Sequence, residues 1–416
     1  MTKLEIFDDI VKTMRGDASF CKDLKGGDAQ KYRNLISGDM SDRQFLFEVN
    51  RYLATFKLVA HLGFGKRGIN NFFPCLLRQY KGELYVVSAP EDSIIKKGHK
   101  IIAVDGVPIS EFIKKYSEFF FEKCEDRLGI LWSKILHYFD ELTLQSPNGQ
   151  YTVKLPLIGE LPFDGYKFSK LSDDICYLLF DDFAQEQPIV NLIDCHSDEI
   201  VNSRYLIIDV RNNGGGLDTA FLPLLKFCLK ERDELCGKPI LPEDRAEYNY
   251  TENNVKERLK ILERYRGFAE EKNLPLFDRE IARNKALRGK GFVTEENSDG
   301  FTYPLHGTPL PERVFVLTDC NCGSSGDSFV QIVSTMEKVT VVGRPTMGIL
   351  DYSNLAFKEY GDFTVFYPTS RRLAIDRGEA MGGKGIPVDI FVPWTPEFLQ
   401  KDSDMEKVFE IINRPN

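Results

Sequence analysis

Short apolar runs alternate with turns of small residues in the last third of the chain. Val314–Leu317 is one such run, and the segment Thr318–Gly326 after it is small and polar. Apolar residues then recur with helical spacing through Phe329–Val333, and Val339–Gly343 is another apolar run. Four apolar residues in a row between turn formers are typical of a buried strand. The pattern therefore predicts the order strand, tight turn, helix, strand.

The turn in this pattern contains a candidate nucleophile, Ser324. Asp327 is placed to cap the first turn of the predicted helix, whose free N–H groups and positive dipole end face the turn. An exposed hydroxyl beside such donors meets the two needs of acyl transfer, a nucleophile and a site for the oxyanion. Ser325 is the alternative nucleophile. The simplest structural explanation is a serine-rich turn that only caps a helix.

A second apolar run, Tyr205–Val210, leads into a loop that ends in three glycines, Arg211–Gly216. Glycines adopt conformations that are closed to other residues, and their successive N–H groups can form an anion-binding nest. The loop lacks the Gly-Lys-Ser/Thr of a phosphate loop, and its spacing does not fit a dinucleotide fingerprint. We therefore interpret it as a loop that binds an oxyanion.

Three segments together resemble one superfamily of peptidases. Ile207–Gly216 is similar to the signature strand and loop of the C-terminal processing peptidases (tail-specific proteases) and the tricorn protease core. Gly323–Asp327 with Val341–Gly348 resembles their nucleophile region, and Gly385–Pro393 resembles their closing segment. The segments occur in the family's order, within a similarity that extends from about residue 50 to 410. The resemblance implies an α/β fold with a crotonase/ClpP-like catalytic core.

The resemblance also implies which residues carry the chemistry. It places the nucleophile on Ser324, and the oxyanion-hole donors on the backbone N–H groups of Gly214 or Gly215 and of Ser325. The implied activity is that of a serine endopeptidase on peptides or unfolded chains, with cleavage near C-termini as one option. No metal or organic cofactor is implied.

The general base is expected from the tricorn-like branch. The processing-peptidase branch has a lysine at the position of Ile349, so that serine–lysine dyad is not expected here. The tricorn-like branch uses a histidine, and Leu58–Phe64 resembles the segment that supplies it, which makes His61 the candidate base. An imidazole suits this role because its ordinary pKa lies close to neutral pH.

The third catalytic member has the weakest sequence signal. The branch's glutamate falls on Gly382 in this chain, and Glu379 lies three residues earlier in a glycine-rich loop. Glu379 is the candidate acid that orients His61, with Asp376 as the alternative. A catalytically weak or inactive protein that binds peptides or small ligands on the same scaffold is the alternative function. Acyl-CoA chemistry has little support, because nothing resembles an adenine or pantetheine site.

Composition narrows the class of protein. Apolar residues make up 42% and charged residues 28% of the chain, which is ordinary for a soluble globular protein. A net charge of −9 argues against a nucleic-acid partner. The nine cysteines show neither a disulfide framework nor paired zinc spacing. The N-terminus has no apolar signal-peptide core, and no apolar run reaches membrane length, so we expect a cytoplasmic protein without a membrane span, with an oligomer left open.

The predicted organisation has five parts. They are an N-terminal helical segment (1–75), a reduced PDZ-like module (76–120), a β-rich connection (121–165), the crotonase-like peptidase core (166–395) and a C-terminal helix (396–416). Gly98–Gly106 resembles part of a PDZ domain, which would capture peptides by strand addition. A charged helical insertion at 230–308 is either a solvated surface element or a lid over the site.

Overall fold

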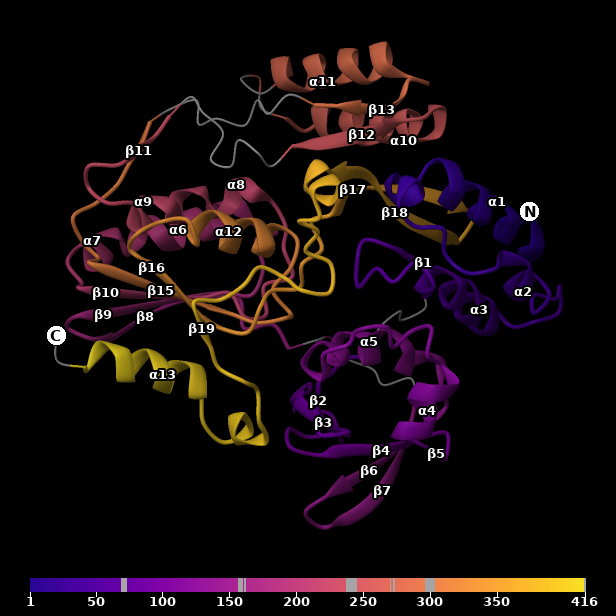
Figure 1. Cartoon of the computed structure of the whole chain (residues 1–416), viewed down its shortest axis with the longest axis horizontal. Coiled ribbons are helices and arrows are strands. Elements are labelled where there is room, and N and C mark those ends of the chain that lie inside the picture. The colour runs from indigo at the N-terminus through magenta and orange to yellow at the C-terminus, as the bar shows by residue number, and fades with distance from the viewer. Residues whose placement is uncertain are drawn as a thin grey trace. The chain divides into compact units, whose positions relative to one another are not determined.

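The computed structural model of this 416-residue chain describes residues 1–68, 73–155, 160, 162–236, 245–269, 271, 274–295 and 304–414. Two compact units make up the chain. The first unit combines Met1–Asn71, Glu243–Asn297 and Asp351–Ala380, and the second unit combines Phe72–Pro242, Ser298–Leu350 and Met381–Asn416. Each unit thus brings together segments that are far apart in the sequence, as the mixture of colours within each part of Figure 1 shows.

A six-stranded sheet forms the centre of the second unit, in the order β19-β16-β15-β10-β9-β8. Its strands are β8 (Tyr166–Ser172), β9 (Ile175–Phe180), β10 (Tyr205–Asp209), β15 (Arg313–Thr318), β16 (Val339–Gly343) and β19 (Ile390–Phe391). The strands from β9 to β19 run parallel, and β8 is antiparallel to β9. The strands predicted at Tyr205–Val210, Val314–Leu317 and Val339–Gly343 are confirmed.

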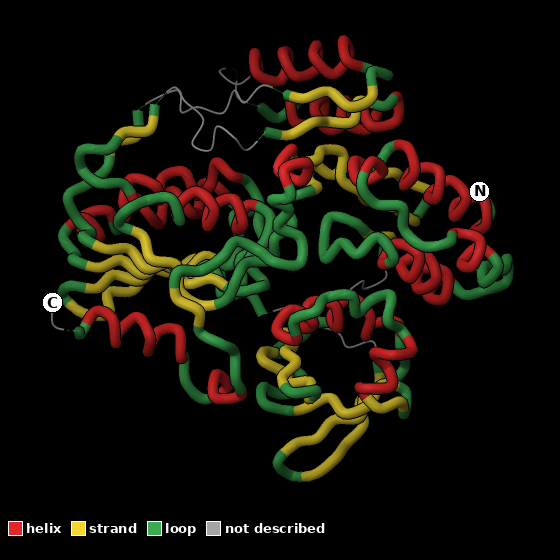
Figure 2. Tube along the Cα trace, in the orientation of Figure 1, coloured by secondary structure: helices red, strands yellow, loops and turns green. Residues whose placement is uncertain are grey.

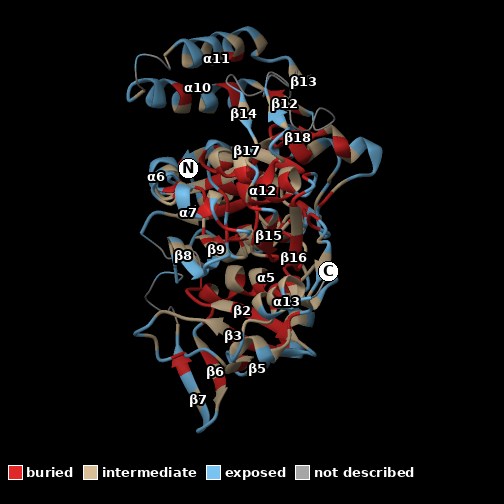
Figure 3. Ribbon diagram, turned by 90° about the vertical axis from the view of Figure 1, so that its left-hand side faces the viewer, coloured by how far each residue is buried: buried red, intermediate tan, exposed pale blue. Residues whose placement is uncertain are grey.

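Helices cover both faces of this sheet, as Figures 1 and 2 show. One face carries α6 (Glu186–Cys195), α7 (Ser197–Val201), α8 (Asp218–Phe221), α9 (Leu225–Cys228) and α12 (Ser325–Val333), and the other carries α13 (Ser403–Ile412). Leu206 and Ile208 pack on the first face, whereas Ile207 packs with Val408 of α13 on the second. Because both faces are buried, each central strand is a continuous apolar run in the sequence. Strands β10 and β15 are buried after their first residue, and Figure 3 colours buried residues red.

A separate antiparallel sheet, in the order β2-β3-β4-β6-β7 with β5 paired to β4, also belongs to the second unit. Its elements are β2 (Leu76–Tyr80), β3 (Glu83–Ser88), β4 (Lys100–Val104), β5 (Val107–Pro108), α4 (Ile109–Lys115), α5 (Leu128–Ile135), β6 (Glu141–Ser146) and β7 (Gly149–Lys154). This sheet spans both the predicted PDZ-like module and the predicted β-rich connection. A short pair, β11 (Glu234–Leu235) with β14 (Leu305–His306), completes the unit.

The first unit packs helices around a five-stranded sheet centred on β18, which pairs with β1, β12 and β17. Its elements are α1 (Lys3–Gly16), α2 (Ala29–Arg33), α3 (Asp42–Ala54), β1 (Gly63–Lys66), β12 (Ala246–Tyr250), α10 (Glu252–Arg266), α11 (Leu274–Leu287), β13 (Gly291–Thr294), β17 (Tyr352–Tyr360) and β18 (Phe363–Arg372). The predicted N-terminal helices are confirmed, and β1 follows them.

The charged helices predicted within the insertion are confirmed as α10 and α11, and α10 begins after Thr251, whose hydroxyl accepts a hydrogen bond from the amide of Asn254 at 3.2 Å. They belong to the first unit and pack together beside β12 and β13. Residues 237–244 and 296–303 of the predicted insertion lie outside the described residues. Among the helices that the structure describes, none is long and apolar enough to cross a bilayer.

Candidate active site

Ser324 lies at the junction of β15 and α12, as the sequence predicted for the nucleophile turn. Its backbone has φ 56° and ψ −119°, in the positive-φ region that residues with side chains rarely adopt. Such a conformation costs of the order of 1–3 kcal/mol, so it persists only where the surroundings fix it. The side chain is half-buried and therefore accessible at the end of the turn.

The neighbouring serine is enclosed. Ser325 is 3% exposed, and its buried hydroxyl has no hydrogen-bond partner within the described ranges. A hydroxyl in this position is shielded from a substrate, whereas its backbone N–H lies at the start of α12, where the helix dipole is positive. This difference favours Ser324 over Ser325 as the nucleophile.

The glycine loop lies directly against the Ser324 turn. The amide of Gly323 donates a hydrogen bond to the carbonyl of Asn213 at 2.9 Å. Gly215 has φ 99°, and a Cβ on it would lie only 2.6 Å from the Cβ of Ser324. A side chain at this position would therefore displace the serine, which explains why the loop needs glycine here.

The N–H groups of two predicted oxyanion-hole residues hold the loop itself in place. The amide of Gly214 donates to the carbonyl of Asp181 at 3.3 Å, and the amide of Gly215 donates to Oδ1 of Asn213 at 3.0 Å. Asn213 is fully buried, and its Nδ2 donates to the carbonyl of Phe180 at 3.0 Å. The role of Gly214 and Gly215 in binding an oxyanion stays a prediction. It requires that one of the two amides leaves its present acceptor, the carbonyl of Asp181 or Oδ1 of Asn213, and donates to the oxyanion instead.

Asp327 does more than the helix capping that the sequence suggested. Its fully buried carboxylate accepts hydrogen bonds from the amides of Ser324 at 2.9 Å, Gly348 at 2.8 Å and Ile349 at 3.0 Å. Burial raises the pKa of this carboxyl group, and the hydrogen bonds from Thr346 and the three amides oppose that rise. Ile349 thus bonds to Asp327 through its backbone amide.

A buried network of charges supports the start of the turn. Asp319 forms ion pairs with Arg78 of β2 at 2.5 Å and with Arg344 at 2.8 Å, and Arg344 pairs with Asp404 of α13 at 2.6 Å. Although burial favours the neutral acid, Arg344 and Arg78 hold the pKa of Asp319 below its ordinary value. The sequence analysis missed these residues. One sequence signal could have indicated the network, namely a charged residue directly after an apolar strand, as Arg344 follows Gly343 at the end of β16.

His61 belongs to the first unit and lies just before β1. Strand β1 pairs with β18, and Asn50 of α3 holds it by donating to the carbonyl of Phe64 at 2.7 Å. Nδ1 of His61 is 2.6 Å from the carbonyl oxygen of Tyr352 on β17. Because a carbonyl can only accept, the proton must be on Nδ1, and the neutral ring keeps its lone pair on Nε2. This is the tautomer that a general base needs.

Glu379 also belongs to the first unit. Its carboxylate pairs with Arg377 at 2.7 Å, and its side chain is 59% exposed. The bond to Nδ1 of His61, which an orienting carboxylate would take, is made by the Tyr352 carbonyl in this structure. The role of Glu379 as the acid that orients His61 stays a prediction.

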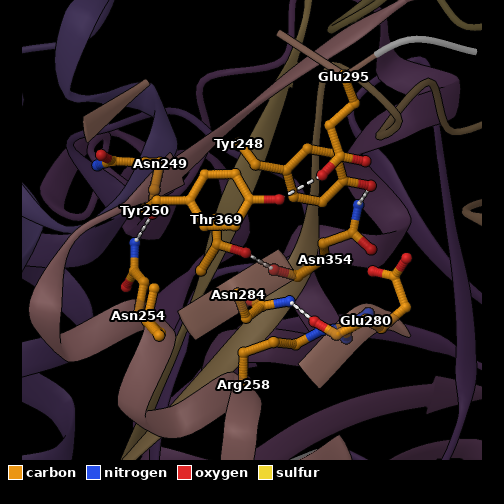
Figure 4. Close-up of a pocket in the computed structure, with 11 residues that line it drawn as sticks. Tyr248, Asn249, Tyr250, Asn254, Arg258, Glu280, Asn284, Glu295, Asn354 and Thr369 are labelled. Carbon is orange, nitrogen blue, oxygen red and sulfur yellow. Dashed lines mark hydrogen bonds between the residues drawn. The ribbon is translucent and has the colours of Figure 1, made fainter. Parts of the chain in front are cut away.

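Two cavities differ in their surroundings. A small one of about 60 Å³ in the first unit is lined by polar side chains that bond to one another, as Figure 4 shows for Tyr250 with Glu295 and for Asn354 with Tyr248. A larger one of about 470 Å³ in the second unit is lined by Asn212 and Asn321, which precede the glycine loop and Ser324. No group of three or more His, Cys, Asp or Glu suited to a metal occurs among the described residues.

Comparisons with known proteins give a matching family and similar folds. The family model described as "Peptidase family S41" matches residues 174–392. Among solved structures, mature CPAF complexed with lactacystin is similar with a TM-score of 0.66 at 14% identity, covering 99% of this chain and 97% of that chain. A protein from Parabacteroides merdae, described as a putative peptidase, has a TM-score of 0.51 at 15% identity and covers 100% and 98%. No curated protein matches the chain. The α/β fold with a crotonase/ClpP-like core is thereby confirmed.

Proposed function

The chain belongs to peptidase family S41 and is a peptidase of the serine type, and we propose that it cleaves peptides or unfolded chains through an acyl-enzyme on Ser324. The observation that carries this proposal is the contrast within one turn. Ser324 is accessible in a strained conformation at the start of α12, and the hydroxyl of Ser325 is buried. Strain of this kind is typical of functional sites.

In the proposed mechanism, Oγ of Ser324 attacks the scissile carbonyl and its proton passes to Nε2 of His61. The tetrahedral oxyanion is held by backbone N–H groups of Ser325 and of Gly214 or Gly215. The imidazolium then protonates the leaving amine, the C–N bond breaks, and the acyl group remains on Ser324. A water molecule, deprotonated by His61, hydrolyses this ester and restores the serine.

His61 acts as the base in this proposal because its Nδ1–H is fixed by the carbonyl of Tyr352 and its Nε2 is the nitrogen with the lone pair. His61 and Ser324 belong to different units, and the proposal requires that the two side chains meet in the catalytic state. We propose Glu379 as the acid that stabilises the imidazolium, which requires that its carboxylate leaves Arg377.

A non-catalytic peptide-binding protein on the same scaffold is the second candidate. The observation that favours it is the engagement of the Gly214 and Gly215 amides within the loop, which leaves them bonded to protein groups. The larger cavity beside Asn212 and Asn321 would then receive the peptide.

The test uses an unfolded, fluorescently labelled casein and the full-length protein. We expect hydrolysis by the wild type, loss of hydrolysis in Ser324→Ala and retention in Ser325→Ala, because only the first variant removes the proposed nucleophile. Binding of casein without hydrolysis by the wild type would instead support the second candidate.

A further inference from the structure

Asp327 joins the Ser324 turn to a loop from elsewhere in the chain. Its Oδ2 accepts from the amides of Ser324 and Ile349, and its Oδ1 accepts from the amide of Gly348. The three amides belong to two segments, the nucleophile turn and the loop Thr346–Ile349. One buried carboxylate therefore fixes both segments at once.

We propose that Asp327 is a positioning residue of this peptidase, whose carboxylate keeps the backbone of Ser324 in its positive-φ conformation and binds the loop Thr346–Ile349 beside it. The inference rests on the proposed nucleophilic role of Ser324. It concerns what holds that serine in place.

The physical reason lies in the strain at Ser324. With φ 56°, the serine would relax to an ordinary conformation if nothing held its amide. A carboxylate forms stronger hydrogen bonds to amides than a neutral acceptor does, and here both of its oxygens are in use. An asparagine of nearly the same volume offers one acceptor oxygen, and its NH₂ group would face a backbone N–H.

The loop on the far side of Asp327 is held independently. Arg127 donates to the carbonyls of Thr346 at 2.7 Å and Met347 at 2.5 Å, and the hydroxyl of Thr346 accepts from the amide of Ile386 at 2.8 Å. Loss of the Asp327 carboxylate should therefore release the serine turn while the loop keeps these anchors. The effect should be local, on the reactivity of Ser324.

The experiment compares Asp327→Asn with Asp17→Asn, because both acids are buried and bonded to protein groups, and only Asp327 bonds to the serine turn. The measured quantities are the second-order rate of fluorophosphonate reaction at Ser324, kcat and KM for casein hydrolysis, and the midpoint of thermal unfolding. We expect Asp327→Asn to lower the labelling rate and kcat by about 10²-fold or more, as displacement of a catalytic group by about 1 Å does. KM should stay within about threefold, since uniform binding is unaffected.

The control should lose thermal stability while keeping its labelling rate, per folded molecule, within about fivefold of the wild type. Labelling of Asp327→Asn at the wild-type rate would overturn the inference. Equal losses of labelling in the two variants would also overturn it, because a general effect of removing a buried acid would then explain both.

Amide hydrogen exchange of the wild-type protein tests the inference without enzymatic turnover. The amides of Ser324, Gly348 and Ile349 should exchange slowly compared with the exposed loop around Gly383. Fast exchange at these amides would contradict the inference. Because this measurement uses the wild-type protein, it still tests the inference if Asp327→Asn does not fold. If the wild type shows no labelling by the fluorophosphonate, the proposed nucleophile is wrong. Slow exchange would then still show that Asp327 keeps its hydrogen bonds to the turn.

Discussion

The surroundings of Ser324 and of His61 are built in different ways. Ser324 is fixed by its own chain neighbours and by two loops of the same unit, through backbone amides, a close glycine and a buried carboxylate. The ring of His61 bonds to the carbonyl of Tyr352, and the strand that follows His61 is paired with β18. Both residues have a positive φ, 56° at Ser324 and 62° at His61, but the contacts of Ser324 are made to its backbone, whereas His61 is bonded through its ring.

This difference indicates how each partner tolerates change. A backbone under strain depends on every group that holds it, so substitutions around Ser324 should affect reactivity even where they do not touch the hydroxyl. An imidazole held by a backbone carbonyl keeps its tautomer as long as the ring remains. The following experiments probe the two regions separately.

Replacement of the candidate base should have the largest effect. His61→Ala should lower kcat by about 10³-fold or more, because the serine hydroxyl then lacks a proton acceptor, while the fold stays intact. The measurement is casein hydrolysis, with circular dichroism to verify folding. His306→Ala is the control, since this histidine is 65% exposed. Near-normal activity of His61→Ala would exclude His61 as the base.

The glycine loop should show the next largest effect. Gly215→Ala should lower kcat by about 10²-fold, because its Cβ would lie 2.6 Å from that of Ser324 in a backbone that disfavours side chains. Gly214→Ala is the matched control, as a Cβ there meets nothing within 4 Å. Steady-state kinetics of both variants check this. If the two variants behave alike, close packing of Gly215 on the serine is not what determines activity.

Removal of the charge of Asp319 should reduce stability. Asp319→Asn should lower the free energy of unfolding by about 3–5 kcal/mol at neutral pH, because Arg78 and Arg344 lose their buried partner. The folded-state pKa of Asp319 is lowered, so its stabilising contribution is present above its ordinary value of 3.8 and is lost as the pH falls through the folded-state value. The deficit of the variant should therefore shrink in acid.

Urea unfolding at about pH 7 and at successively lower pH measures this deficit. Asp278→Asn serves as the comparison, because its ion pair with Arg266 is exposed on the surface of the first unit and should contribute little to stability. A deficit of Asp319→Asn that is as small as that of Asp278→Asn would show that the buried network does not support the turn.

Neutralisation of Glu379 should have the smallest effect. The carbonyl of Tyr352 already holds Nδ1 of His61, and the Glu379 carboxylate is bonded to Arg377 at an exposed position. We therefore expect Glu379→Gln to lower kcat by about tenfold, through loss of imidazolium stabilisation alone, against about 10⁴-fold where the acid itself bonds the catalytic histidine. Kinetics of Glu379→Gln beside Glu379→Ala measure the effect. An unchanged kcat in both variants would contradict the proposed role of Glu379.

Central strands of the six-stranded sheet β19-β16-β15-β10-β9-β8 could be predicted from the sequence, because strands that are buried on both faces consist of uninterrupted apolar runs. The runs Val314–Leu317 and Tyr205–Val210 predicted β15 and β10, and the glycines and small residues that follow each run predicted the turns. The capping role of Asp327 was equally predictable, since helix starts have short local signals.

Long-range placement did not follow from the sequence. Nothing in the segment around residue 250 indicated that β12 pairs with β18, more than 100 residues away, because short strands with mixed burial have no distinctive pattern. The partners of Asp319 and the carbonyl that holds His61 were also missed, since backbone groups and ion pairs between distant segments leave no trace in local composition.

The most direct test of the central claim is to identify the residue that a fluorophosphonate probe modifies in the wild-type protein, by tandem mass spectrometry of its peptides. The proposed mechanism predicts one adduct, on Ser324, that disappears in Ser324→Ala and persists in Ser325→Ala. An adduct on Ser325, or a wild-type protein that remains unmodified under conditions that label other serine peptidases, would contradict the assignment of Ser324 as the nucleophile.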